Sequence, residues 1–199
     1  MITMKVTKER AAQNRRALVR AAGKLFRKHG IDGVGVAEIG EETGLTHGAL
    51  YAQFPSKQAL AAEALAEGLE RNYARLVGRA KGAAPTIGYH LDLFINKRHR
   101  DNIAQGCAMA ASGSEIARHD KSVSRSFAEG FERSVRAIEA IVEDASLSTS
   151  ERERALVIAV GEIGAIVVAR GVAKANPKLS EEVLAASRRV LGEIGGERK

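Results

Sequence analysis

The chain has 199 residues, a net charge of +7, 45% hydrophobic residues and only three prolines, so a packed core is expected and disorder is not. The scarcity of proline, together with stretches rich in Ala, Glu, Lys and Arg, favours helices over strands. A single cysteine excludes an internal disulfide and suits a reducing cytoplasm, while no apolar run is expected to span a bilayer or to form a signal-peptide core.

Positive charge is concentrated at the N-terminus. Within residues 1–30, nine Lys and Arg residues stand against Glu9 alone, so this segment carries +8 and the remainder of the chain is close to neutral. Such an asymmetry suggests a polyanionic partner. A solvated helix face and a basic membrane-surface helix are the alternatives, although the narrow apolar stripe at Leu18, Ala22, Leu25 and Phe26 favours packing on other helices.

The first third of the chain reads as four helices. Gly30 ends the first helix, Gly44 supplies a tight turn after the second, and Thr46 is expected to cap the third. Pro55 ends the third helix, because proline disfavours helical backbone in the residue before it. The predicted helices cover residues 8–29, 36–43, 46–54 and 56–80.

Two short helices joined by a glycine turn and braced by a longer helix form a helix-turn-helix. The second helix of such a unit lies in the DNA major groove, so its outward residues are candidates for contacts with bases and phosphates. Considered singly, Thr46 is interpreted as a helix cap, Tyr51 as a cover over the core and His47 as a surface residue. Considered together with the basic segment, these residues are interpreted as DNA contacts. The candidates are Thr46, His47, Gly48, Tyr51, Gln53 and Lys57.

Residues 21–65 resemble the N-terminal domain of the TetR family of transcriptional regulators. The matching pieces are "AAGKLF", "VAEI" and "TGLTHGALYAQFPSK". The resemblance implies an all-α homodimer in which residues 1–70 form a three-helix DNA-binding domain with the start of a connecting helix. Residues 71–199 would form a larger helical domain for dimerisation and for sensing a small molecule.

Three positions depart from the family pattern. Gly35 stands where the family often has a Ser or Thr that contacts a phosphate, so a backbone N–H is the remaining donor there. Gly40 replaces a common Ala and weakens the second helix by up to about 1 kcal/mol. His47 replaces a common Lys, so the base preference of the family does not carry over.

The C-terminal part is expected to be helical over residues 86–98, 104–118, 121–145, 150–175 and 180–194, with a capping box formed by Ser148 and Glu151. Aromatic and sulfur-containing residues gather in its middle helices, where most serve as core and some are candidates for lining an effector cavity. Cys107, the only thiol, is read as a buried small residue, with a redox sensor as the alternative. The ligand candidates are Tyr89, Phe94, Cys107, Met109, Phe127 and Phe131.

The last two helices carry apolar stripes that contain small residues. The family resemblance implies that they pair with their symmetry mates in a four-helix bundle, and burial within their own domain is the alternative. The candidates for the dimer interface are Val157, Val160, Gly161, Ile163, Gly164, Val168, Val183, Ser187, Val190 and Ile194.

No spacing typical of a metal site and no glycine-rich phosphate-binding loop is found, and paired carboxylates such as Glu41 and Glu42 read as solvated charge. Neither a metal, a cofactor nor enzymatic activity is therefore expected. The expected function is a DNA-binding transcriptional regulator in the cytoplasm, a homodimer that is released from a double-stranded operator by an unknown small molecule. Two rivals remain: a non-specific nucleic-acid-binding protein, and a small-molecule carrier with a vestigial DNA domain.

Overall fold

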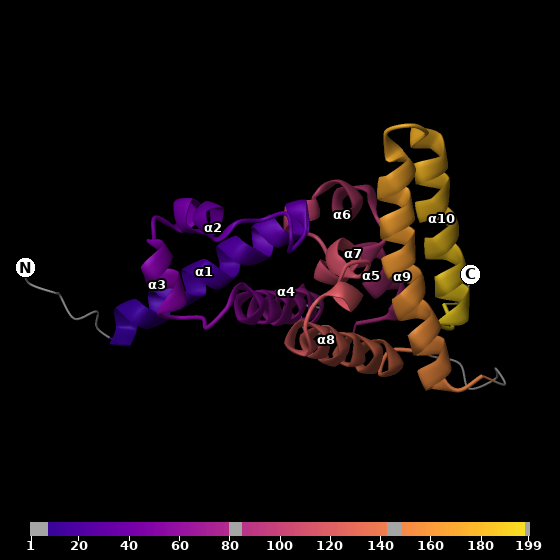
Figure 1. The fold of residues 1–199 in the computed structure, drawn as a ribbon. Helices are drawn as coiled ribbons and strands as arrows, with labels where there is room; N and C mark the ends of the chain where they lie inside the picture. Colours follow the sequence, from indigo (N-terminus) through magenta and orange to yellow (C-terminus); the bar gives the residue numbers. More distant parts are fainter. Residues whose placement is uncertain (1–7, 80–84, 143–148, 198–199) are drawn as a thin grey trace, which may run out of the picture.

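The computed structural model describes residues 8–79, 85–142 and 149–197, with side chains omitted for residues 75–79. Within these ranges the chain forms α-helices and two short 3-10 helices and no strand, which confirms the all-α prediction (Figure 1). The elements are α1 (Lys8–His29), α2 (Val36–Thr43), α3 (His47–Tyr51), α4 (Lys57–Arg79), α5 (Ile87–Phe94), α6 (Lys97–Asp101), η1 (Ile103–Gln105), α7 (Ala108–Ser112), η2 (Ile116–Arg118), α8 (Lys121–Glu139), α9 (Glu151–Ala173) and α10 (Pro177–Ile194).

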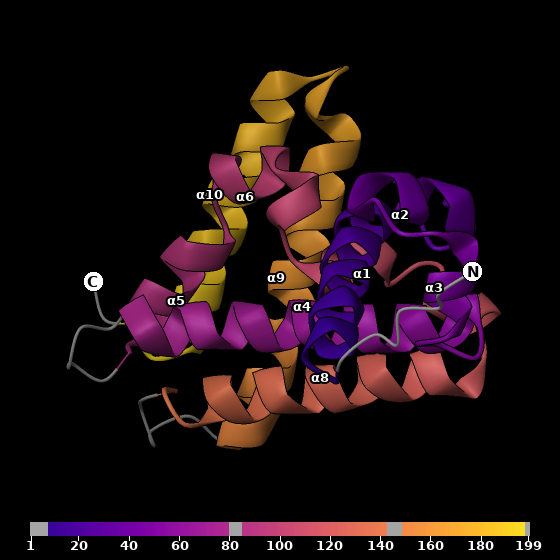
Figure 2. The ribbon, with the colours of Figure 1, turned by 90° about the vertical axis from the view of Figure 1, so that its left-hand side faces the viewer.

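The helices are arranged along one long axis. α1, α2 and α3 lie at one end of the molecule, and the antiparallel pair α9–α10 stands at the other (Figure 1). Between them α4 and α8 run side by side, as Figure 2 shows from the end of the molecule that carries α3. Because α4 packs on α1 at one end and on α8 along its length, it connects the two ends of the molecule.

Two hydrophobic clusters form the core. The first, the N-terminal core, joins α1–α4 through fully buried residues such as Leu18, Ile39 and Leu60. It also takes in residues from η2, α7 and α8. The second, the C-terminal core, joins α5, α8, α9 and α10. Since the N-terminal core includes residues far beyond position 70, the three N-terminal helices are packed firmly against the C-terminal half.

Polar contacts strengthen the junction between the two halves. Arg27, near the end of α1, is 6% exposed, and its Nε donates to the carbonyl oxygen of Ala104 at 2.8 Å. From the other side, the buried carboxylate of Glu115 accepts from the backbone N–H of Ile31 at 3.1 Å. Such contacts are costly to break, because each would leave a buried charged group without its partner.

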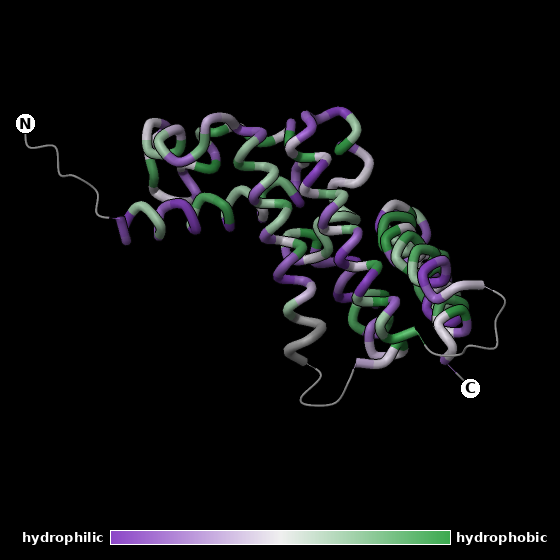
Figure 3. The backbone as a smooth tube through the Cα atoms, turned by 90° about the horizontal axis from the view of Figure 1, so that it is seen from below, coloured by the Kyte–Doolittle hydropathy of each residue, from purple (hydrophilic) through white to green (hydrophobic). Residues whose placement is uncertain are grey.

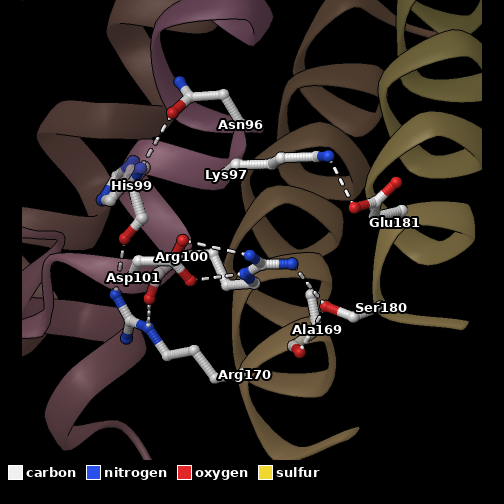
Figure 4. Close-up of polar contacts among 9 residues, drawn as sticks. All are labelled: Asn96, Lys97, His99, Arg100, Asp101, Ala169, Arg170, Ser180 and Glu181. Carbon is white, nitrogen blue, oxygen red and sulfur yellow. Dashed lines mark hydrogen bonds and ion pairs between the residues drawn. The ribbon is translucent and has the colours of Figure 1, made fainter. Parts of the chain in front are cut away.

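Side chains of α9 and α10 hold α6 in place (Figure 4). The guanidinium of Arg170 donates to the carbonyl oxygens of His99 and Arg100, which would otherwise lack partners at the end of this short helix. Arg100 in turn donates to the hydroxyl of Ser180 at 2.9 Å, and Lys97 pairs with Glu181 at 2.5 Å. A five-residue helix is thereby fixed to the C-terminal pair.

The middle of the chain is more broken than the sequence predicts. The expected helix over residues 86–98 is divided, because α5 ends at Phe94 and the side chain of Asn96 accepts from the N–H of His99 to begin α6. The expected helix over residues 104–118 is divided into η1, α7 and η2. The third helix is also shorter than predicted and ends at Tyr51 rather than at Phe54.

The capping box at the start of α9 lies two residues later than predicted. Ser150 Oγ accepts from the N–H of Glu153, and the carboxylate of Glu153 accepts from the N–H of Ser150 at 2.9 Å. The predicted pair of Ser148 and Glu151 is therefore wrong, since Glu151 is the first residue of the helix; Ser148 itself lies outside the described residues. The hydroxyl of Ser150 also donates to the carboxylate of Glu153 at 2.7 Å, and chiefly this hydrogen bond, followed by that from the N–H of Ser150, lowers the pKa of Glu153.

Among the described residues, α9 alone is long and apolar enough to cross a membrane. By length and composition, the expectation that no run is long enough was wrong. α9 packs against α10, α8, α7 and α6, and it carries the buried carboxylate of Glu162 on its inner side. Long hydrophobic stretches along this pair are visible in Figure 3.

We predict that Ser150→Ala lowers the free energy of unfolding by about 1 kcal/mol, because an N-cap hydroxyl is lost at the start of α9. Urea denaturation followed by circular dichroism measures the change. Thr149→Ala is the matched control, since Thr149 is exposed and directly precedes the cap. Equal stability of the two variants would contradict the assignment of Ser150 as the cap.

Candidate nucleic-acid interface

The turn between α2 and α3 depends on two glycines. Gly44 has a φ of 66°, a left-handed conformation that side chains disfavour, and the N–H of Leu45 donates to the carbonyl oxygen of Gly40 at 3.0 Å. A Cβ on Gly40 would lie 2.7 Å from the carbonyl oxygen of Leu45. In this chain the glycine at position 40 thus permits a close turn, which accounts for its presence despite its low helix propensity.

α3 is too short to be stable alone and is held by its surroundings. The side chain of Thr46 accepts from the N–H of Ala49 at 3.2 Å, which confirms the predicted cap. Leu50 and Phe54 are at most 1% exposed and anchor the helix in the N-terminal core. The helix is therefore positioned by one cap and two buried side chains.

Arg15 of α1 fastens the end of α3 to α4. Its Cζ lies 4.1 Å from the ring centroid of Phe54, and its Nη1 donates to the carbonyl oxygen of Gln53 at 2.5 Å. The same guanidinium forms a bidentate pair with Glu63, in which Nε lies 3.0 Å from Oε1. One of the basic residues of the N-terminus thus acts within the protein and braces the turn that follows α3.

The opposite side of α3 is open. Thr46, His47, Gly48 and Tyr51 are exposed, and the rings of His47 and Tyr51 lie next to each other with centroids 4.7 Å apart. A Cβ on Gly48 would meet no atom within 4 Å, so another molecule can approach the backbone there. These four candidates therefore share one accessible surface, which we call the α3 face.

The remaining three candidates lie outside the α3 face: two follow α3 in the chain, and the third precedes α2. Gln53 is half-buried, and its carbonyl oxygen is bound by Arg15. Lys57 is half-buried at the first turn of α4. Gly35 precedes α2 in extended backbone, makes no side-chain cap, and a Cβ there would also meet open space.

The N-terminal segment exposes less positive charge than its formal charge of +8 indicates. Arg15 is paired with Glu63, Arg27 is buried, and Lys24 Nζ lies 2.6 Å from Glu42, whose pKa is lowered chiefly by this contact. The basic side chains of α1 that stay exposed are those of Lys8, Arg10, Arg16, Arg20 and Lys28.

The predicted ligand residues divide around two cavities in the C-terminal half. The outer cleft, of about 560 Å³, lies between α4 and the segment from α5 to η1. The inner chamber, of about 30 Å³, lies behind it. Phe94 lines both, and Cys107 and Met109 line the inner chamber. Tyr89, Phe127 and Phe131 line neither, and the last two pack against the hydrophobic clusters.

Sequence reasoning missed the polar residues of the inner chamber, which are Asn72, Tyr73, His90, Ser134 and Glu162. The signal was present, because His90 and Glu162 each interrupt an apolar helix segment, "YHLDLF" and "VGEIGAIVV". A buried polar residue in such a segment has a hydrogen-bonding or functional reason to be there.

Not all of the predicted dimer residues face outward. Val157, Val160, Val168 and Val190 are 40–60% exposed, and Gly164 borders open space. The other five are half-buried in the single chain. Ile163 lines the inner chamber, and a Cβ on Gly161 would meet Leu191 of α10. Val183 and Ile194 pack against the C-terminal core, and Ser187 is the remaining residue.

Two comparisons of sequence relate the chain to known proteins. The profile of the family described as "Bacterial regulatory proteins, tetR family" matches residues 18–64. An uncharacterized HTH-type transcriptional regulator of Bacillus subtilis, YuxN, is 30% identical over 84 residues, which are 42% of this chain and 29% of that protein. The matched part thus spans less than a third of that relative.

Solved structures resemble this chain in fold over nearly its whole length. A TetR-family regulator from Agrobacterium tumefaciens superposes with a TM-score of 0.74 at 18% identity and covers 92% of this chain and 98% of its own. The regulatory protein TetR from Rhodobacter sphaeroides gives 0.70 at 21% identity, with 90% and 97% covered. At such identities the likeness is one of fold.

The helix-turn-helix at residues 36–51, braced by α1 and joined through α4 to a helical C-terminal half, defines a regulator-type DNA-binding fold. Residues 18–64 match the TetR family of bacterial regulatory proteins, and the fold of the chain is that of solved TetR-family regulators.

Cys107 is 8% exposed, and burial raises the pKa of its thiol. A raised pKa keeps the thiol protonated above its ordinary range, so the reactive thiolate forms only at strongly alkaline pH. We predict slow alkylation of the folded protein by iodoacetamide at pH 7 and a rate that rises with pH. Cys107 in urea-unfolded protein is the control. Rapid modification of the folded chain at neutral pH would support the sensor interpretation instead.

Proposed function

We propose that the chain is a sequence-specific DNA-binding transcriptional regulator that acts in the cytoplasm as a homodimer, most simply as a repressor released by a small molecule. The observation that carries this proposal is the α3 face, an open polar surface on a rigidly anchored helix. The exposed basic residues of α1 lie on the same domain and supply the charge that attracts DNA.

The residues of the α3 face and the candidates near it differ in what they offer DNA. His47 begins the helix and presents a ring that can donate to or accept from a base edge. Tyr51, one turn later, and Lys57, at the start of α4, lie where phosphates flank the groove. Gly35 and Gly48 leave backbone N–H groups accessible, and Gln53 follows α3 in the chain.

The dimer would use the outward face of α9 and α10. Four valines on this face are at least 40% exposed, and the open position of Gly164 permits a close approach of another helix. Exposed apolar residues gathered on one face mark an interaction surface. Two copies joined there would present two α3 faces to half-sites one helical turn, or a multiple, apart.

Release by a ligand follows from linkage. A ligand that prefers a separation of the two α3 faces unsuited to DNA weakens DNA binding by the same factor by which DNA weakens ligand binding. The contact of Arg27 with Ala104 and the passage of α4 between the two halves give such a ligand a mechanical route to the DNA-binding helices.

A shift assay with genomic fragments against random competitor separates this proposal from its rivals. Retention of one short palindromic site supports a regulator. Equal binding of all fragments would indicate a non-specific nucleic-acid-binding protein, and no binding would indicate a small-molecule carrier.

We predict different effects for three substitutions on the α3 face and near it. His47→Ala should weaken binding to the best site by roughly 1–3 kcal/mol and relax preference at one base pair. Lys57→Ala should weaken all sequences alike and lower the salt dependence by about one unit per lost phosphate contact in each half-site. Tyr51→Phe should cost roughly 0.5–1.5 kcal/mol of binding without a loss of stability.

Operator titrations at several salt concentrations measure these effects, with melting curves as the folding control. His29→Ala and Lys178→Ala are the matched controls, because both residues are exposed and lie away from the α3 face. If His47→Ala weakened every sequence equally while Lys57→Ala changed base preference, α3 would not lie in the groove as proposed.

For the dimer, we predict that Val160→Asp produces monomers, because a charge would be buried in an apolar seam. Val160 is 60% exposed in the single chain, so the monomer should stay folded. Light scattering measures the mass. Ile103→Asp is the control, since Ile103 is an exposed apolar residue outside this face. Dimers that persist in Val160→Asp would move the interface elsewhere.

A further inference from the structure

The inner chamber contains a buried polar pair in an apolar setting. His90 of α5 and Glu162 of α9 are 3% and 6% exposed, and Nε2 of the histidine lies 2.7 Å from Oε2 of the glutamate. The walls around them are mostly apolar and include Phe94 and Met109, and the hydroxyl-bearing residues Tyr73 of α4 and Ser134 of α8 also line the chamber. Removing two such groups from water is costly, so they are expected to use their hydrogen-bonding capacity fully.

Two buried nitrogen atoms of this chamber have no hydrogen-bond partner among the described residues. They are Nδ1 of His90 and Nδ2 of Asn72. Both residues line the same chamber, although they come from α5 and α4. In folded proteins nearly all buried polar atoms are paired, so two orphans that share one cavity indicate a ligand with a polar atom at this place.

The chemistry of the two unpaired nitrogen atoms restricts which polar group of a ligand can bind both of them. Asn72 Nδ2 is a donor and needs an acceptor. Because Glu162 holds Nε2 of His90, Nδ1 is a lone pair when the ring is neutral and an N–H when the ring is protonated. A hydroxyl oxygen satisfies both nitrogens in either state, since it accepts from Asn72 and can either donate to Nδ1 or accept from it. A bare carbonyl or ether cannot donate to a neutral histidine.

The size of the chamber also favours a hydroxyl. A volume of about 30 Å³ holds little more than one water-sized group, so the body of the ligand must lie elsewhere. The adjoining outer cleft, of about 560 Å³, lies within the usual range for small-molecule sites and shares Asn72 and Phe94 with the chamber. The hydroxyl would enter the chamber while the body remains in the cleft.

The side chain between the two spaces is aromatic. The ring of Phe94 lies 4.8 Å from that of His90 and 5.5 Å from that of His99, so three rings form a continuous wall. A flat aromatic body packs on such a wall more favourably than an aliphatic one of equal size. We therefore infer that the effector is a small phenol, whose hydroxyl is bound by Asn72 and His90 and whose ring lies against Phe94. This inference rests on the proposed release of the regulator by a small molecule.

The test compares 4-methylphenol, toluene and 4-methylcyclohexanol as probes by isothermal titration calorimetry with the full chain. The wild type should bind 4-methylphenol at least about tenfold more tightly than toluene, because a buried hydrogen bond contributes roughly this factor. It should bind the cyclohexanol more weakly than the phenol. Equal binding of phenol and toluene would overturn the polar site, and equal binding of phenol and cyclohexanol would overturn the aromatic one.

Substitutions locate the bound hydroxyl. Asn72→Leu should weaken 4-methylphenol about tenfold and leave toluene unchanged, and His90→Phe should do the same. Asn14→Leu is the matched control, because Asn14 lies on α1 and lines neither cavity, and it should alter neither affinity. A loss with Asn14→Leu, or an equal loss for both probes with Asn72→Leu, would place the ligand elsewhere. Melting temperatures show whether each variant is folded.

Operator binding separates this inference from the proposed function. Without a probe, the protein should retain an operator fragment, and 4-methylphenol, but not toluene at the same concentration, should weaken that binding. Failure to bind any operator would overturn the regulator proposal even if the phenol bound. Firm operator binding that no phenol weakens would overturn the effector assignment and leave the regulator intact.

Discussion

The whole proposed DNA interface depends on the anchoring of a five-residue helix. α3 is far too short to persist in water, because so few hydrogen bonds cannot offset the entropy of ordering the backbone. Burial of Leu50 and Phe54 supplies the missing stability, and Arg15 adds a polar brace from α1 to the carbonyl end of the helix and to α4. The outward residues of α3 can be both exposed and fixed in position because the inward residues are fully buried in the core.

That anchoring continues into the C-terminal half without a break. The N-terminal core takes in residues of α7, η2 and α8, and Arg27 and Glu115 bridge the two halves by hydrogen bonds to backbone atoms. Further along, Arg170 and Ser180 hold α6 against α9 and α10. The middle helices are therefore joined to the N-terminal helices by continuous packing, which is the path that the proposed release by a ligand would use.

Charge and hydrophobicity each serve two purposes in this chain. Part of the basic N-terminus is used inside the protein, where Arg15 and Arg27 act as multidentate donors, so net charge overstates the surface offered to DNA. In the same way, α9 is apolar enough to pass as a membrane helix, yet one side of it packs within the fold and carries the pair with His90, while the other exposes valines. The composition of the chain counts buried and exposed residues together, so it cannot distinguish these internal roles from the surface ones.

The sequence by itself determined the all-helical class, the bounds of α1 and α2, the cap at Thr46 and the outward set on α3. These features rest on contacts within a few residues, such as the left-handed turn at Gly44 and the helical spacing that buries Leu50. The sequence also predicts a capping box before α9. Two serines there have the required spacing to a glutamate, so the local pattern alone could not identify Ser150 as the cap.

Only the tertiary structure decided the rest. The direction of Ile163 into the chamber rather than outward depends on how α9 is rotated against α4 and α8, which helical periodicity leaves open when both sides of a helix are apolar. The pairing of His90 with Glu162 joins residues 72 positions apart, and the orphan nitrogen of Asn72 meets them from a third helix. Such sites arise where separate helices converge, so the physical constraint that creates them is packing in three dimensions.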